Sequence, residues 1–148
     1  TVKKLLDEYT GKVNWVLRHF PLSFHENSQK EAEASECAAS LGGSNVYWKY
    51  IDAIFERTKT GGTGFALDKL VPLAKELGLD EAKFKNCLDS GTMTARTERD
   101  FAEGQSAGID GVPSTIVLTK GGAWTLVQGA VPYDELKDAV DALLAQEK

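Results

Sequence analysis

The stretch from residue 108 to 118 constrains the fold of this chain more than any other. A glycine-containing turn leads into Pro113, and a run rich in β-branched residues follows, which is the pattern of a loop that enters a β-strand. Three turn residues at 120–122 and a second apolar run come next. We therefore predict a β-hairpin with strands at residues 114–119 and 123–128.

A helix is predicted directly after this hairpin, over residues 132–145. Its apolar side chains recur at the spacing i, i+4, i+7 and i+8, so that they form one stripe along the helix. They are Leu136, Val140, Leu143 and Leu144. A stripe of this width covers one face of a sheet, so the C-terminal part of the chain predicts an α/β arrangement of two strands and a packing helix.

The region before the hairpin is predicted to be helical. Ser28 and Glu31 have the capping-box spacing, which predicts a helix start at Ser28, and the glycines at 42–43 predict its end. A second helical stripe then follows. Its members are Tyr47, Tyr50, Ile51, Ile54 and Phe55. The glycine-rich residues 60–64 predict a loop.

Three further helices are predicted between this loop and the hairpin. One runs over residues 68–77, and the next runs from an N-cap at Asp80 to Asp89. The last begins after Thr92 or Thr94. At the other end of the chain the apolar side chains also have helical spacing, which predicts an amphipathic first helix. They are Val2, Leu5, Leu6 and Tyr9.

Composition limits the class of protein and its partners. The 148 residues are 42% hydrophobic, enough for one globular domain, and no apolar run approaches the length of a membrane span. The net charge is −5 and the basic residues are scattered among acidic ones, so nucleic acid is not an expected partner.

The chain has two cysteines, Cys37 and Cys87, and two histidines, His19 and His25. Acidic neighbours raise the pKa of a thiol, so both cysteines are expected to be poor nucleophiles. Each lies on the apolar side of its helix, and a structural disulfide, buried free thiols and a redox role all remain open. The four residues contain no short ligand pair, so we expect no metal site, and we expect His25 in a solvent-facing loop.

Four segments together resemble the DsbA-like family of thiol-disulfide oxidoreductases. They are VNWVLRHFPL at 13–22, AEASECAA at 32–39, YWKYIDAIF at 47–55 and KFKNCLDSG at 83–91. The resemblance implies an α/β, thioredoxin-like fold with an inserted all-helical subdomain. It further implies a single DsbA-like domain over residues 1–148.

The resemblance also implies how this domain is divided. Residues 1–27 and 108–148 would form the thioredoxin-like core, with a strand at 13–18, and residues 28–107 would form the helical insertion.

Site residues also follow from the resemblance. In thioredoxin-like folds the proline of such a loop is cis and the preceding residue offers its backbone to an extended peptide, so Val112 and Pro113 are expected to bind substrate. Cysteine pairs in the helical insertion are joined in some DsbA-like proteins, which implies a structural disulfide between Cys37 and Cys87. Such a bond is typical of an oxidising compartment, so we expect a periplasmic or cell-envelope location.

The family carries a catalytic Cys-x-x-Cys motif at the end of its first strand, and this sequence contains none. The family pattern would place that strand and motif before Thr1, so we expect that the N-terminal β-strand is missing from the given chain. The missing strand would lie at the centre of the sheet. Either that segment or a strand of a neighbouring molecule would be needed to fill the place, because each unpaired buried group costs about 1–3 kcal/mol.

We therefore predict a thiol-disulfide oxidoreductase of the DsbA-like family that acts on protein thiols, with the catalytic cysteines absent from this chain. Whether the chain alone is an enzyme stays open. A redox-inactive thioredoxin-fold module that binds peptides or a partner is one alternative, and a glutathione-handling enzyme is another. The expected partners are protein or peptide thiols and a redox partner protein, and no cofactor is expected.

Overall fold

The computed structural model of the protein describes residues 2–58 and 63–147. The chain forms two compact units. Unit 1 contains residues 1–18 and 104–148, and unit 2 contains residues 19–103. The chain therefore passes from one unit to the other twice, at residues 18–19 and at residues 103–104.

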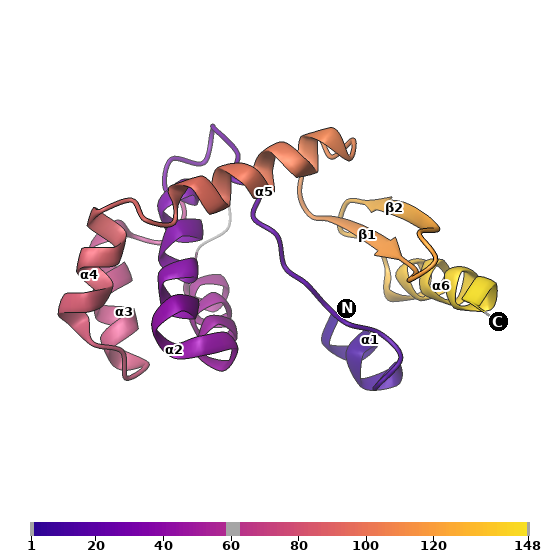
Figure 1. Ribbon diagram of the computed structural model, residues 1–148, viewed down its shortest axis with the longest axis horizontal. Helices are drawn as coiled ribbons and strands as arrows, with labels where there is room; N and C mark the ends of the chain where they lie inside the picture. The colour runs from indigo at the N-terminus through magenta and orange to yellow at the C-terminus, as the bar shows by residue number, and fades with distance from the viewer. Residues whose placement is uncertain (1, 59–62, 148) are drawn as a thin grey trace. The chain divides into compact units, whose positions relative to one another are not determined.

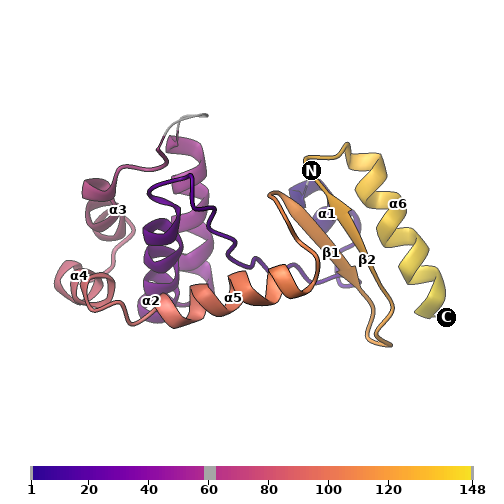
Figure 2. The same cartoon turned by 90° about the horizontal axis from the view of Figure 1, so that it is seen from above.

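Unit 1 contains the predicted hairpin. Strands β1 (Ser114–Leu118) and β2 (Trp124–Gln128) are antiparallel, with Ser114 opposite Gln128 and Leu118 opposite Trp124 (Figure 2). The tight turn between them is closed by a hydrogen bond of 3.1 Å from the N–H of Gly122 to the carbonyl of Thr119. The strand and turn predictions are confirmed.

Two helices pack with the hairpin to form the core of unit 1. They are α1 (Val2–Glu8) and α6 (Tyr133–Leu144), and a short 3-10 turn (Ala145–Glu147) follows α6. The buried residues of this core are Leu5, Tyr9, Val127, Leu136 and Val140. Part of each predicted apolar stripe faces this core: Leu5 and Tyr9 of the first, and Leu136, Val140 and Leu144 of the second.

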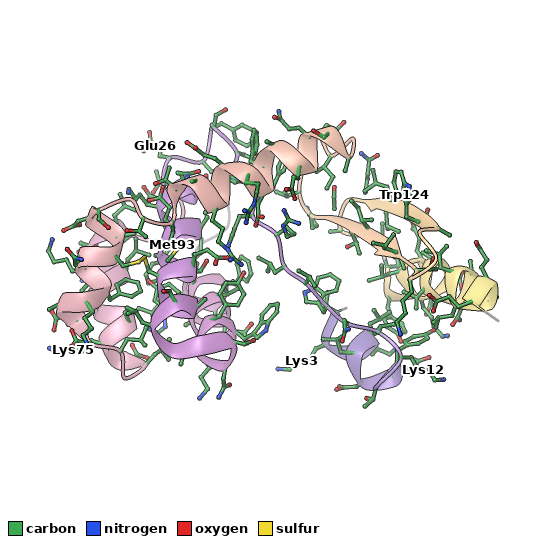
Figure 3. The ribbon with its side chains drawn as sticks, viewed as in Figure 1. Lys3, Lys12, Glu26, Lys75, Met93 and Trp124 are labelled. Atoms are coloured by element: carbon green, nitrogen blue, oxygen red, sulfur yellow. A yellow bond between two sulfur atoms is a disulfide. The ribbon has the colours of Figure 1, made fainter. Side chains whose placement is uncertain are left out.

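The other face of the hairpin is exposed. Leu118 is 65% exposed and Trp124 opposite it is 55% exposed, because side chains alternate along a strand and Val117 and Val127 take the core side (Figure 3).

Polar side chains add a second connection between α1 and α6. The hydroxyl of Tyr9 donates to Asp141 Oδ1 at 2.5 Å, and Lys137 Nζ donates to the same hydroxyl at 2.8 Å. Glu8 accepts from the hydroxyl of Tyr133. Because Tyr9 is buried, this network fixes the end of α1 against α6.

The strand predicted at residues 13–18 is wrong. These residues have no regular secondary structure, and the sheet among the described residues contains only β1 and β2. The segment keeps the alternation of a strand, with Val13, Trp15 and Leu17 half-buried between exposed neighbours. A strand also needs a hydrogen-bonded neighbour, and no described segment pairs with this one.

Unit 2 is helical. It contains α2 (Ser28–Arg57), a 3-10 turn (Leu67–Lys69), α3 (Leu70–Glu76), α4 (Glu81–Asp89) and most of α5 (Thr94–Ser106). Helices α2, α3 and α4 lie side by side around one apolar core (Figure 1). The largest fully buried side chains of this core are Tyr50, Phe84, Leu70 and Leu73. Met93 packs against the same core (Figure 3).

Helix α2 is kinked where the sequence predicted an end. Gly43 has φ +75°, a conformation that favours glycine, and helical structure resumes after it. The second stripe is largely confirmed, because Tyr47, Tyr50, Ile51 and Ile54 are buried. Phe55 is an error of that prediction: it is 67% exposed, since it lies at the edge of the stripe near the end of the helix.

The predicted helix starts have different outcomes. Asp80 caps α4 as expected and accepts from the N–H of Lys83 at 2.9 Å. The capping box at Ser28 is wrong, because the Ser28 hydroxyl donates to the carbonyls of Leu22 and His25 instead. Glu31 accepts from the N–H of Phe65, a tertiary contact that replaces the local one.

The predicted helices at 68–77 and 80–89, and the helix after Thr92 or Thr94, are confirmed within one or two residues. The loop predicted at 60–64 lies partly outside the described residues, which exclude 59–62.

Candidate functional site: the Val112–Pro113 loop, the disulfide and a buried polar cluster

The loop before β1 has the expected backbone. The peptide bond between Val112 and Pro113 is cis. The carbonyl of Pro113 accepts from the N–H of Gly129 at 2.8 Å, and the hydroxyl of Ser114 donates to the carbonyl of Gly111, also at 2.8 Å. These two bonds tie both sides of the proline to the hairpin, so the position of the loop is set by unit 1 itself.

Val112 is the exposed residue of this loop. Val112 is 52% exposed, and among the described residues its backbone N–H and C=O have no hydrogen-bond partner. A backbone with free groups next to the start of a strand can pair with an extended peptide. The loop therefore has what the predicted binding role of Val112 requires.

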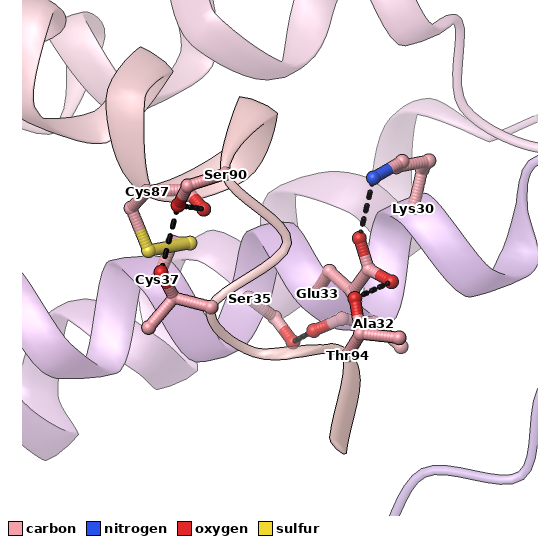
Figure 4. The surroundings of a disulfide bond; sticks show 9 residues. Lys30, Ala32, Glu33, Ser35, Cys37, Cys87, Ser90 and Thr94 are labelled. Atoms are coloured by element: carbon pink, nitrogen blue, oxygen red, sulfur yellow. Dashed lines mark hydrogen bonds and ion pairs between the residues drawn. A yellow bond between two sulfur atoms is a disulfide. The ribbon is translucent and has the colours of Figure 1, made fainter. Parts of the chain in front are cut away.

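The two cysteines form a disulfide between α2 and α4. The Sγ atoms of Cys37 and Cys87 are 2.03 Å apart and the Cα atoms 6.0 Å (Figure 4). Cys37 is fully buried and Cys87 half-buried, and the hydroxyl of Ser90 donates to the carbonyl of Cys87. The predicted disulfide is confirmed. Since the sequence has no other cysteine, it offers no free thiol for exchange.

A buried polar cluster, which the sequence did not predict, lies in unit 2. His19 is 8% exposed and its Nε2 lies 3.0 Å from Glu36 Oε1 on α2. Arg96 Nε of α5 lies 2.6 Å from the other oxygen of the same carboxylate. The backbone N–H of His19 donates to Asp100 Oδ2 of α5 at 3.1 Å. Glu36 and Asp100, both almost fully buried, thus receive bonds from neighbouring segments.

The charge of Glu36 is stabilised by these contacts. Burial raises the pKa of this carboxyl, but the bond from His19 and the charge of Arg96 outweigh burial, so the pKa lies below the ordinary glutamate value. The pKa of the neighbouring Tyr47 is raised, first by burial and then by the negative charge of Glu36. Glu36 is therefore ionised and Tyr47 neutral at neutral pH.

The cluster does not have the geometry of a catalytic triad. Ser35 Oγ lies 3.3 Å from His19 Nε2, but Glu36 occupies the same nitrogen, whereas a triad needs the acid and the serine on different nitrogens. Ser35 is also 1% exposed, and its hydroxyl donates to the carbonyl of Ala32. The arrangement is a positioning network and leaves no accessible nucleophile.

A second acidic side chain of α2, Glu33, extends this network. Its carboxylate accepts from Lys30 Nζ at 2.6 Å and from the hydroxyl of Thr94 at 2.9 Å (Figure 4). Gln29 of the same helix donates to the hydroxyl of Thr97 at 2.7 Å. The first turns of α5 are thus bonded to α2 by polar side chains.

The sequence carries one sign of these buried acidic residues. Glu33 and Glu36 stand in an alanine-rich helix segment, on the positions that an apolar face would occupy. A carboxylate among small apolar residues at helical spacing predicts a buried acid with a partner, although not which partner.

The structure also places the second histidine and bears on whether side chains gather as in a metal site. His25 is exposed in the loop before α2, as predicted. Within residues 2–58 and 63–147, no group of three or more histidine, cysteine or acidic side chains has the arrangement of a metal site. No described helix has both the length and the apolar character needed to cross a membrane.

A two-stranded hairpin after the Val112–Pro113 loop, with two helices packed on it, and a separate helical unit agree with a thioredoxin-like fold of the DsbA type. The sequence model of the thioredoxin family matches residues 1–142. The chain therefore belongs to the thioredoxin family.

Two known proteins show how this chain relates to others. The crystal structure of DsbA2 from Pseudomonas aeruginosa matches with a TM-score of 0.80 and 28% identity, over 96% of this chain and 77% of that one. The Na⁺/H⁺ antiporter NhaA of Herminiimonas arsenicoxydans is 33% identical over 105 residues. That match takes in 71% of this chain but 16% of the antiporter, so the antiporter's name describes a much longer protein.

Proposed function

We propose that this chain carries the substrate-binding part of a thiol-disulfide oxidoreductase that acts on protein thiols. The observation that carries the proposal is Val112 in the loop before β1, an exposed residue whose backbone N–H and C=O have no hydrogen-bond partner among the described residues. Membership of the thioredoxin family and the likeness to DsbA2 support the same class of reaction.

The exchange needs a redox-active cysteine pair from outside these 148 residues. The disulfide between Cys37 and Cys87 is buried at Cys37, and the sequence has no Cys-x-x-Cys motif. In the proposed reaction, a substrate thiolate attacks one sulfur of an oxidised pair and releases the other as a thiolate. A second substrate thiolate then attacks the substrate sulfur of this mixed disulfide. The substrate loses two electrons and the pair is reduced.

Val112 and Pro113 have different roles in this proposal. The N–H and C=O of Val112 pair with the backbone of an extended substrate segment, as in strand addition. Pro113 has no N–H, and its carbonyl is already bonded to Gly129. Pairing through the backbone tolerates many side chains, which suits an enzyme that acts on different protein substrates.

The Cys37–Cys87 bond has a structural role in this proposal, and it favours an oxidising, extracytoplasmic compartment. The redox partner is a protein that restores the oxidised pair. The assignment of 1–27 and 108–148 to a thioredoxin-like core, with 28–107 as its helical insertion, stays a prediction.

Peptide binding tests the role of the loop. We expect an extended peptide with a serine in place of its cysteine to shift the backbone resonances of residues 111–114. Val112→Pro removes the N–H and should weaken binding, whereas Val112→Ala keeps the backbone and should bind nearly as the parent does.

A peptide that is N-methylated at the pairing position is the reciprocal control and should bind weakly to all three proteins. Equal affinity of the parent and of Val112→Pro, with the hairpin resonances of both unchanged elsewhere, would overturn the assignment.

A further inference from the structure

Both places where the chain passes between its two units adjoin the buried polar cluster of unit 2. His19 is the first residue of unit 2 after the first crossing, and Asp100 lies one helical turn before the second crossing, at residues 103–104 of α5. The His19 N–H donates to Asp100 Oδ2 at 3.1 Å. One hydrogen bond therefore joins the two connecting segments of the chain.

Glu36 joins the same two segments a second time. One of its oxygens lies 3.0 Å from His19 Nε2, and the other lies 2.6 Å from Arg96 Nε of α5. Glu36 belongs to α2, which forms the main core of unit 2. The cluster His19, Glu36, Arg96 and Asp100 thus connects both segments to each other and to a rigid helix.

Helix α5 is held in this position mainly by polar contacts. Its buried residues are Thr97 and Asp100, both polar, and Thr94 and Thr97 are bonded to Glu33 and Gln29 of α2. The rings of Phe20 and Phe101 have centroids 4.5 Å apart and form a further contact between the two connecting segments.

We propose that His19, Glu36, Arg96 and Asp100 form a clamp within unit 2 that holds the segment beginning at His19 and helix α5 against α2. Breaking any one contact of the clamp is unfavourable, because a buried carboxylate that loses one partner is left with an uncompensated charge. Separation of α5 from α2 would expose polar side chains, because the buried residues of α5 are Thr97 and Asp100. This proposal does not depend on the proposed function.

Hydrogen exchange of the full chain tests the clamp. Glu36→Gln removes the carboxylate charge that His19 and Arg96 contact, and we expect the amides of His19 and of residues 94–100 to exchange about tenfold faster or more. Amides of α4 and α6 should keep their rates. Glu98→Gln removes the same charge from an exposed position of α5 and should change none of these rates. A uniform acceleration throughout unit 2, or none in the two segments, would overturn the proposal.

Two further variants test the Arg96 contact and the His19–Asp100 hydrogen bond separately. They keep the proposal testable if Glu36→Gln does not fold. Arg96→Gln removes the exposed partner of Glu36 and should accelerate exchange in the first turns of α5 but not at the His19 amide. Asp100→Ala removes the acceptor of the His19 N–H, so the His19 amide should lose protection. An unchanged His19 amide in Asp100→Ala would overturn the link between the two segments.

Discussion

The imidazole of His19 lies 3.0 Å from the carboxylate of Glu36, with both side chains almost fully buried and 17 residues apart in the sequence. Neither residue belongs to the loop that we propose for substrate binding. Their contact instead connects the segment that enters unit 2 with the helix at the centre of its core. The loop that we propose for substrate binding belongs to unit 1, whereas this network of buried polar contacts belongs to unit 2.

Stability should depend on pH through Glu36. Burial raises its pKa and His19 and Arg96 lower it, with a net decrease in the folded state. Since the folded pKa is below the unfolded one, the contribution is present above the ordinary glutamate range and is lost as the pH falls through the folded pKa. Denaturant unfolding of the parent and Glu36→Gln should show a difference that is largest near neutral pH and shrinks in acid. A difference independent of pH would contradict this assignment.

The disulfide should be a large part of the stability of unit 2. It closes a loop with a sequence separation of 50 residues, and removing it in Cys37→Ala/Cys87→Ala should cost about 4 kcal/mol in the chain-entropy model. Chemical denaturation of the oxidised and reduced parent gives the comparison. Reductant should lower the stability of the parent and leave the double variant unchanged. A response of the double variant to reductant would show that another group is responsible.

Gly42 should tolerate no side chain. A Cβ at this position would lie 2.7 Å from Val46 and 2.9 Å from Leu79, so Gly42→Ala should destabilise the protein by about 1–3 kcal/mol through overpacking. Gly121→Ala is the matched control, because its nearest neighbour would be Thr119 Oγ1 at 3.8 Å, and it should change stability by less than about 0.5 kcal/mol. Thermal unfolding measures both, and equal effects would contradict the packing at the kink.

The hydroxyl of Tyr9 should stabilise unit 1. It bonds to Asp141 and Lys137 from a buried ring, so Tyr9→Phe should cost about 1 kcal/mol or more. Tyr133→Phe removes a hydroxyl that bonds to Glu8 from a less buried ring and should cost less. Urea unfolding of the two variants compares them. A larger loss in Tyr133→Phe would mean that the connection of α1 to α6 depends on Glu8 instead.

The elements that could be predicted from the sequence are those set by local patterns. The hairpin at residues 114–128, helix α6 and the cap at Asp80 depend on turn residues, periodicity and one N-terminal side chain, all of which are contiguous in the chain. The disulfide was implied by the family resemblance and by the apolar helix faces on which Cys37 and Cys87 lie.

The features that could not be predicted depend on partners far away in the sequence. The capping box at Ser28 failed because Glu31 bonds to Phe65 instead, 34 residues on. The segment at 13–18 has the alternation of a strand, but strand formation also requires a neighbour. The buried cluster joins His19, Glu36 and Asp100, and no local pattern shows which distant side chains will meet.

Oxidation of a peptide dithiol, assayed with the protein isolated from its native source, tests the central claim most directly. Our account predicts catalysed formation of the peptide disulfide, slowed by Val112→Pro and retained in Cys37→Ala/Cys87→Ala once folding of that variant is verified. No catalysed exchange, or exchange that disappears with Cys37 and Cys87 in a folded variant, would contradict a DsbA-like oxidoreductase in which these two cysteines are structural.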